Sequence, residues 1–162
     1  MKSSEKTISQ ILKDYYHTLA NDDNIVQEPQ VAYGNESFLD NFMAFELISK
    51  GIPYSVFNDV LQVSPFSKSE WADFLGLSIK TFQRAEAGNK LFKPIHSEKI
   101  IELSEVIELG REVFGSIEKF KQWLHTSNFA LGGKTPKELL ANSFGKELVM
   151  EELVNIDQGI FV

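Results

Sequence analysis

Apolar residues recur at the three- and four-residue spacing of an α-helix along nearly the whole chain. The first stretch with this spacing covers about 5–20, a long one covers 97–114, and the last covers 144–154. Glycine, proline and short polar runs interrupt the pattern, so several short helices are expected besides the long one. The spacing predicts an all-α protein in which the helix at 5–20 packs against the helices that follow.

A further helix is expected from about residue 37, after a polar segment, 21–36, that has the composition of a linker. Gly51 is well placed to cap the C-terminus of this helix, and Pro53 is well placed to open the next one. The apolar residues of the helix that starts near residue 37 are expected to be Phe38, Phe42, Phe45 and Ile48. Closer to the C-terminus, a helix over 117–125 is expected to place Trp123 and Leu124 in the core.

Two short helices meet at a glycine turn within 67–87. The first begins with the capping-box pattern Ser-Lys-Ser-Glu at 67–70 and stops at Gly76. Ser78 is a good N-cap for the second helix, 79–87. Two short helices separated by about three residues, with glycine at the turn, are typical of a helix-turn-helix.

The second of these helices has a polar face that suits DNA, because short polar and cationic side chains near a helix start can reach base edges and phosphates. The residues expected to contact DNA are Lys80, Thr81, Gln83 and Arg84, with Lys68 and Lys90 as neighbouring phosphate contacts. Residues 66–99 carry six basic and four acidic side chains, although the whole chain has a net charge of −7. An ordinary helical corner with a solvated polar face is the alternative interpretation.

Other features of the sequence argue against several classes of protein. It has no cysteine, which excludes disulfides and thiolate metal sites and suits a reducing cytoplasm. No signal peptide and no run of about 18 apolar residues is visible, so we expect a cytoplasmic protein without a membrane span. The three histidines lie far apart, and no nucleophile–base pair is evident, so we expect no metal, cofactor or enzymatic activity. Acidic pairs such as Glu105/Glu108 and Glu151/Glu152 are expected to be solvated.

Residues 133–135 read Gly-Lys-Thr, the last letters of a phosphate-binding P-loop. Asn128 replaces the first glycine of that motif, and Pro136 removes an amide that could face a phosphate, so no nucleotide site is expected. Thr135 and Glu138 instead fit a capping box with proline in the first helical position. The glycines before it are expected to make a tight turn at positive φ.

Several motifs near the C-terminus occur together: 113–115, 123–124, Asn128 with 130–133, 135–136 with 139–140, Gly145, Val149, Leu153 and Gly159. In this order and spacing, 113–162 resembles the C-terminal toxin-binding domain of Xre/MbcA/ParS-type antitoxins. Residues 51–88, with 76–78 and 81–84, resemble the Xre-like helix-turn-helix that precedes that domain. One departure is Ala85, where many relatives carry a bulkier or aromatic residue.

The resemblance implies an antitoxin of a type II toxin–antitoxin system. Such a protein binds and silences a toxin encoded beside it, usually a RES-domain toxin that degrades NAD, and represses its own operon. The candidate toxin-binding residues lie in a loop and in the apolar tail, which needs a cover: Asn128, Leu131, Gly132, Gly133 and Lys134, then Gly159, Ile160, Phe161 and Val162. Either its own domain or a partner must cover the tail, and we expect the cover to be the toxin or a sister subunit.

The expected organisation is an N-terminal extension, 1–36, a helical Xre-like domain, 37–112, and a toxin-binding domain, 113–162. A homodimer would read two operator half-sites about one helical turn apart. The alternative is a stand-alone helix-turn-helix transcriptional regulator whose C-terminal domain dimerises or senses a ligand. A toxin gene beside this one would favour the antitoxin.

Overall fold

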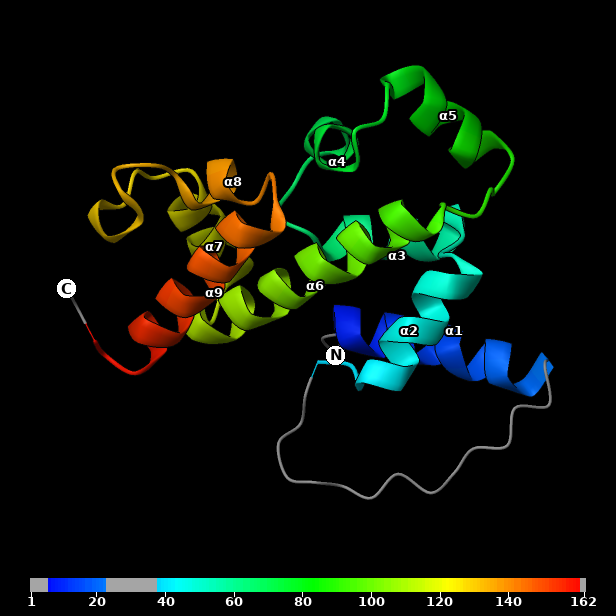
Figure 1. Cartoon of the computed structure of the whole chain (residues 1–162), viewed down its shortest axis with the longest axis horizontal. Helices are drawn as coiled ribbons and strands as arrows, with labels where there is room; N and C mark the ends of the chain where they lie inside the picture. The colour runs from blue at the N-terminus through cyan, green and yellow to red at the C-terminus, as the bar shows by residue number, and fades with distance from the viewer. Residues whose placement is uncertain (1–5, 23–37, 161–162) are drawn as a thin grey trace, which may run out of the picture.

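The computed structural model describes residues 6–22 and 38–160, and within those ranges the chain is all-α, as the sequence predicts (Figure 1). An isolated bridge between Pro53 and Leu91 is the only β-type pairing in those ranges. In chain order the helices described are α1 (Ile8–Asp22), α2 (Asn41–Lys50), α3 (Tyr54–Val63), α4 (Lys68–Leu75), α5 (Ile79–Ala87), α6 (Pro94–Phe114), α7 (Ile117–Leu124), the 3₁₀ helix η1 (Phe129–Leu131), α8 (Pro136–Leu139) and α9 (Ser143–Asp157).

Helix α6 runs through the middle of the molecule and contacts helices from both halves of the chain (Figure 1). It packs against α1, α2 and α4, which precede it in the sequence, and against α7 and α9, which follow it. The helix begins three residues before the predicted start, because Pro94 occupies the first turn and Lys93 supplies no side-chain cap that a sequence pattern could reveal. The predicted domain boundary between residues 112 and 113 falls within the last turn of α6. The domain limits therefore stay a prediction.

A cluster of aromatic rings fills the core between α3, α4, α5 and α6. Phe57 is fully buried at its centre. Its ring centroid lies 5.2 Å from that of Trp71, 5.4 Å from that of Phe82 and 5.2 Å from that of Phe92, all edge to face. Tyr54 packs against the same rings. These contacts join the two short helices α4 and α5 to the rest of the fold.

The N-terminal helix α1 packs into the same core, as the sequence predicts. It buries Ile8, Leu12, Tyr16 and Ala20 and contacts α2, α3 and α6. Its first free backbone N–H, that of Ile8, donates to the carboxylate of Glu108 on α6 at 2.7 Å. The prediction that Glu108 is merely solvated is therefore wrong, because the carboxylate satisfies a helix-end donor 100 residues away in sequence.

Of the four apolar residues predicted for the second helix, Phe38 and Ile48 pack against the core, but two do not. Phe42 and Phe45 are 59% and 61% exposed, whereas Met43 and Leu47 are buried. The helix begins at Asn41, since Asp40 caps it by accepting from the Met43 N–H. Four apolar residues follow one another at 42–45, so the helical period alone could not identify the buried face.

The aromatic residues of α7 lie against the end of α6. Phe120 and Leu124 are fully buried, and a side chain at Gly110 of α6 would overlap the Phe120 ring. Trp123 is half-buried against the core, with its ring centroid 5.5 Å from that of Phe114. The prediction that Trp123 and Leu124 belong to the core is confirmed.

Helices α8 and α9 approach each other closely at Gly145. A Cβ atom at this position would overlap the backbone carbonyl of Leu139. Asn142 caps α9 by accepting from the Gly145 N–H at 3.0 Å. The next residue, Lys146, is buried, and its ammonium reaches across to Glu105 of α6 at 2.8 Å. Glu105 is thus an ion-pair partner as well as a surface acid, which corrects the prediction that it is only solvated.

Candidate functional site

Helices α4 and α5 form the corner that the sequence predicts, with the predicted bounds. Ser67 caps α4 in a full capping box, and Gly76 ends it in the left-handed region at φ 63°. Ser78 then caps α5 by accepting from the Thr81 N–H. Ala72 and Phe82 are buried where the two helices cross. This arrangement is a helix-turn-helix with α5 in the place of the recognition helix.

The outer face of α5 carries the four predicted contact residues. Lys80, Gln83 and Arg84 are exposed along it. Thr81 is exposed as well, and its hydroxyl lies 2.9 Å from the hydroxyl of Ser78. The structure thus gathers these side chains on one solvent-facing surface of one helix, which is the geometry that insertion into a major groove requires. Their contact with DNA stays a prediction.

The two flanking lysines differ in their surroundings. Lys68 forms an ion pair with Glu86 of α5, and its ammonium lies 5.9 Å from the ring centroids of both Tyr54 and Phe82. The hydrogen bond to Glu86 raises the pKa of Lys68. This lysine therefore also braces α4 against α5, a role that the sequence did not suggest. Lys90, after the end of α5, is exposed.

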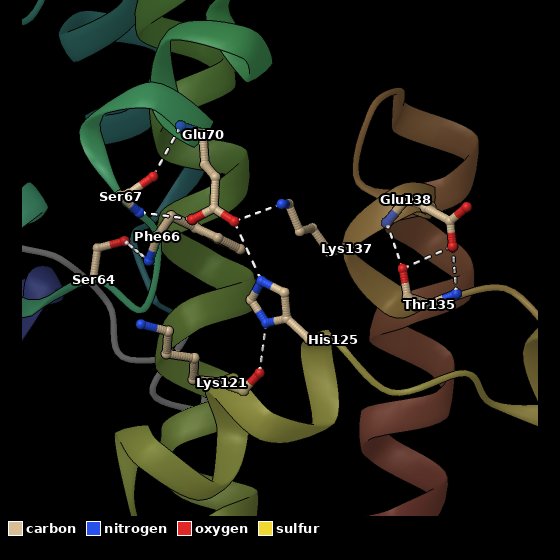
Figure 2. A network of polar contacts seen from close by, with 9 residues as sticks. All are labelled: Ser64, Phe66, Ser67, Glu70, Lys121, His125, Thr135, Lys137 and Glu138. Carbon is tan, nitrogen blue, oxygen red and sulfur yellow. Dashed lines mark hydrogen bonds and ion pairs between the residues drawn. The ribbon is translucent and has the colours of Figure 1, made fainter.

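One carboxylate joins the helix-turn-helix to the C-terminal helices (Figure 2). Glu70 completes the α4 capping box by accepting from the Ser67 N–H at 2.7 Å. Its other oxygen accepts from Lys137 of α8 and lies 3.2 Å from Nε2 of His125, at the end of α7. The other ring nitrogen of His125 lies 2.8 Å from the Lys121 carbonyl oxygen. His125 is thus held between a backbone carbonyl of its own helix and the carboxylate of Glu70.

Sequence patterns identified the cap made by Glu70 but not its partners, since His125 is 55 residues away. An open cleft of about 400 Å³ lies beside this network, between α4 and α8. The residues that line it are Asp73, Phe74, His125, Thr135, Lys137, Glu138 and Ala141. The Glu70 contacts cross one edge of this cleft and fix the position of α4 relative to α8.

Replacing Glu70 by glutamine is expected to make the chain less stable at pH 7 but not at strongly acidic pH. Burial raises the pKa of Glu70, but the hydrogen bonds from Lys137, the Ser67 N–H and His125 outweigh it and hold the pKa at about 2. A depressed pKa means that the carboxylate stabilises the fold above the unfolded pKa of about 4.3, and this contribution is lost as the pH falls towards 2.

Glutamine keeps an oxygen for the cap but loses the charge. We therefore expect Glu70→Gln to lower the free energy of unfolding at pH 7 by on the order of 2 kcal/mol, allowing for the half-exposed partners. Urea unfolding of both proteins between pH 7 and pH 3 measures the difference. A difference that stays constant over that range would contradict the role of the charge.

The loop after α7 is closed by its own backbone. The N–H of Asn128 donates to the Lys134 carbonyl at 3.0 Å, and its carbonyl accepts from Gly133 at 2.9 Å. Its side chain accepts from the Ala130 N–H, which starts η1. Gly132 and Gly133 have φ values of 67° and 77°, which confirms the positive φ expected of these glycines.

This loop leads into the capping box predicted for α8. Thr135 accepts from the Glu138 N–H, and Glu138 accepts from the Thr135 N–H at 2.8 Å. Of the candidate toxin-binding residues here, Lys134 is exposed, whereas Leu131 is 8% exposed and supports the loop from inside. The amide of Asn128 donates to Glu152 of α9, so Glu152 holds the loop in place rather than being only solvated.

The C-terminal tail leaves α9 through a left-handed glycine. Gly159 has φ 69°, and the N–H of Ile160 donates back to the Asn155 carbonyl at 2.8 Å. Ile160 is 48% exposed. Phe161 and Val162, which complete the predicted toxin-binding tail, lie outside the described residues. Contact between this tail and a partner stays a prediction.

Two large apolar side chains of the C-terminal half are almost fully exposed, and sequence reasoning named neither as a contact residue. Phe129 of η1 is 91% exposed and Phe144 of α9 is 88% exposed. Hydrophobicity alone predicts burial for such residues. Only the orientation of each helix on the core reveals that these two point outward.

Across 6–22 and 38–160, no group of three or more His, Cys, Asp or Glu side chains is placed to hold a metal ion. Over the same part of the chain, no helix combines the length and apolar character needed to cross a membrane.

The fold therefore defines a class of protein: a helix-turn-helix, α4 and α5, is joined through the long helix α6 to a C-terminal group of helices, α7 to α9. Residues 43–105 match the family model described as the antitoxin Xre-like helix-turn-helix domain. Residues 109–159 match the model described as the antitoxin Xre/MbcA/ParS C-terminal toxin-binding domain. The chain therefore belongs to the Xre/MbcA/ParS-type antitoxins. A search of curated proteins returns no significant match.

Proposed function

We propose that this protein binds and neutralises a toxin encoded beside it and represses its own operon through α5. The observation that carries the proposal is the succession of two matched domains, a helix-turn-helix over 43–105 and a toxin-binding domain over 109–159. The expected toxin is a RES-domain protein that degrades NAD, because such toxins are the usual partners of the antitoxins that this chain resembles. The protein acts by binding, most simply by covering the active site of the toxin, and not by catalysis.

The DNA-contacting residues in this proposal lie on and beside α5: Lys68, Lys80, Thr81, Gln83, Arg84 and Lys90. The exposed face of α5 supports the assignment, since Lys80 and Arg84 extend into solvent together. Two copies of the chain would place two such helices in successive major grooves, about 34 Å apart on one side of the DNA. The loop 128–134 and the tail 159–162 are proposed to contact the toxin.

Co-expression with the neighbouring gene tests this function. We expect the neighbouring gene alone to arrest growth, the pair to restore it, and the two proteins to purify as one complex. The physical reason is that an antitoxin of this type works as a stoichiometric binder, so protection requires a stable complex. A neighbour that is harmless when expressed alone, together with a set of distant regulated genes, would instead favour the stand-alone transcriptional regulator.

A further inference from the structure

The solvent-facing side of α9 carries an apolar ridge that no other part of the described chain covers. Phe144 is 88% exposed and Leu148 is 49% exposed. Residues four apart lie on the same side of a helix, one turn above the other, so these two side chains form one continuous surface. Exposed apolar groups that are adjacent in this way mark an interaction surface more often than isolated ones do.

The backbone beneath this ridge is held from the opposite side. Gly145 lies directly against the backbone of Leu139, and Val149 and Leu153 are fully buried in the core. Lys146 adds its ion pair to Glu105 of α6. A helix that is fixed in this way presents Phe144 in a defined direction before any partner arrives. Little conformational entropy of the backbone is then lost on binding.

The charges beside the ridge are acidic. Helix α9 contains four acidic residues: Glu147, Glu151, Glu152 and Asp157. Its one cation, Lys146, is 9% exposed, and its ammonium lies 2.8 Å from Glu105 of α6 and 3.3 Å from Glu147, so the ridge keeps a net negative charge. A surface of this sign repels DNA phosphates, so the ridge is not part of the operator contact. A second copy of the same ridge is also disfavoured, because a two-fold interface would place Glu147 and Glu151 close to their own counterparts.

We propose that the Phe144–Leu148 ridge is the anchor by which the protein holds its toxin, and that the toxin receives it in an apolar pocket bordered by lysine or arginine side chains. This inference rests on the proposed function and adds to it a surface distinct from the loop 128–134 and the tail 159–162. The ridge lies within the residues matched by the toxin-binding family model, 109–159. Truncation of a buried aromatic anchor is among the costliest changes in protein interfaces.

The test measures the affinity of the full-length protein for the neighbouring-gene product, separated from the co-purified complex by denaturation and refolded. We expect Phe144→Ala to raise the dissociation constant at least about tenfold, and Phe144→Ala with Leu148→Ala to raise it further. The matched control is Phe45→Ala, which removes an equally large exposed ring from α2 and should change the affinity by less than about twofold. Circular dichroism and thermal unfolding verify that each variant is folded.

A second pair of substitutions tests the charge of the pocket. Glu147→Gln with Glu151→Gln should slow association at low salt and flatten the dependence of the association rate on ionic strength, because fewer opposite charges attract the partner. The double variant keeps the size and shape of both side chains.

The outcomes separate this inference from the function on which it rests. Tight binding by the wild type and by the Phe144 variants alike would overturn the ridge while leaving the antitoxin function intact. A loss of self-association with unchanged toxin affinity would assign the ridge to a second copy and also overturn the inference. No binding by the folded wild type would overturn both.

Discussion

Lys80→Ala with Arg84→Ala is expected to lower the affinity for DNA upstream of the gene by about 100-fold or more. Both side chains project from the exposed face of α5, where a recognition helix contacts bases and phosphates. Each lost contact costs on the order of 1–3 kcal/mol, and a dimer loses both contacts twice. Fluorescence anisotropy with a labelled operator fragment at several salt concentrations measures the loss.

The measurements at several salt concentrations separate contacts to phosphates from contacts to bases. Loss of phosphate contacts should reduce the slope of log affinity against log salt by about one for each contact removed. Lys119→Ala with Lys121→Ala on α7 is the matched control, because it removes the same charge from exposed positions away from α5. Unchanged operator affinity in the α5 variant would mean that another element reads the DNA. Toxin binding should be the same in all of these proteins.

Gly145→Ala is expected to destabilise the fold by on the order of 3 kcal/mol, although alanine is the better helix former. The added methyl group would overlap the backbone carbonyl of Leu139, and a backbone atom cannot move aside as a flexible side chain can. Helices α8 and α9 would have to separate, which would disturb the Lys146–Glu105 ion pair beyond them. Urea unfolding followed by circular dichroism measures the effect.

Gly88→Ala is the matched control for that experiment. Gly88 has φ −101°, which alanine adopts without strain, and the nearest atom to its added methyl would be Cγ of Lys90 at 3.3 Å. A lysine side chain can move by a few tenths of an ångström, so we expect a change below about 0.5 kcal/mol. Equal unfolding midpoints for the wild type and Gly145→Ala would show that α8 and α9 are less closely packed than described.

The elements best predicted from sequence are those with local boundary signals. The bounds of α4 and α5 were predicted because Ser67, Gly76, Ser78 and Gly88 mark them at fixed positions. The buried face of α2 was predicted only in part, since four consecutive apolar residues at 42–45 leave no clear periodicity. The 3₁₀ helix η1 is only three residues long and leaves no periodic pattern.

The candidate site was predictable where it lies within one helix. The polar face of α5 follows directly from the spacing of its residues. The bridge from Glu70 to His125 and Lys137 could not be foreseen, because it joins three helices whose mutual positions are set by the core. The same holds for Phe144, whose exposure depends on which side of α9 packs against α6 and α8.

The junction between the two matched domains, at residues 105 and 109, has a consequence for how such antitoxins can diversify. Glu105 and Glu108 lie one turn apart on α6, yet Glu105 holds α9 and Glu108 holds the first turn of α1. A chimera joined between these two glutamates would separate both of them from their native partners, Lys146 and Ile8. We therefore expect the DNA-binding and toxin-binding domains to be inherited together in recombination and not to be exchanged separately.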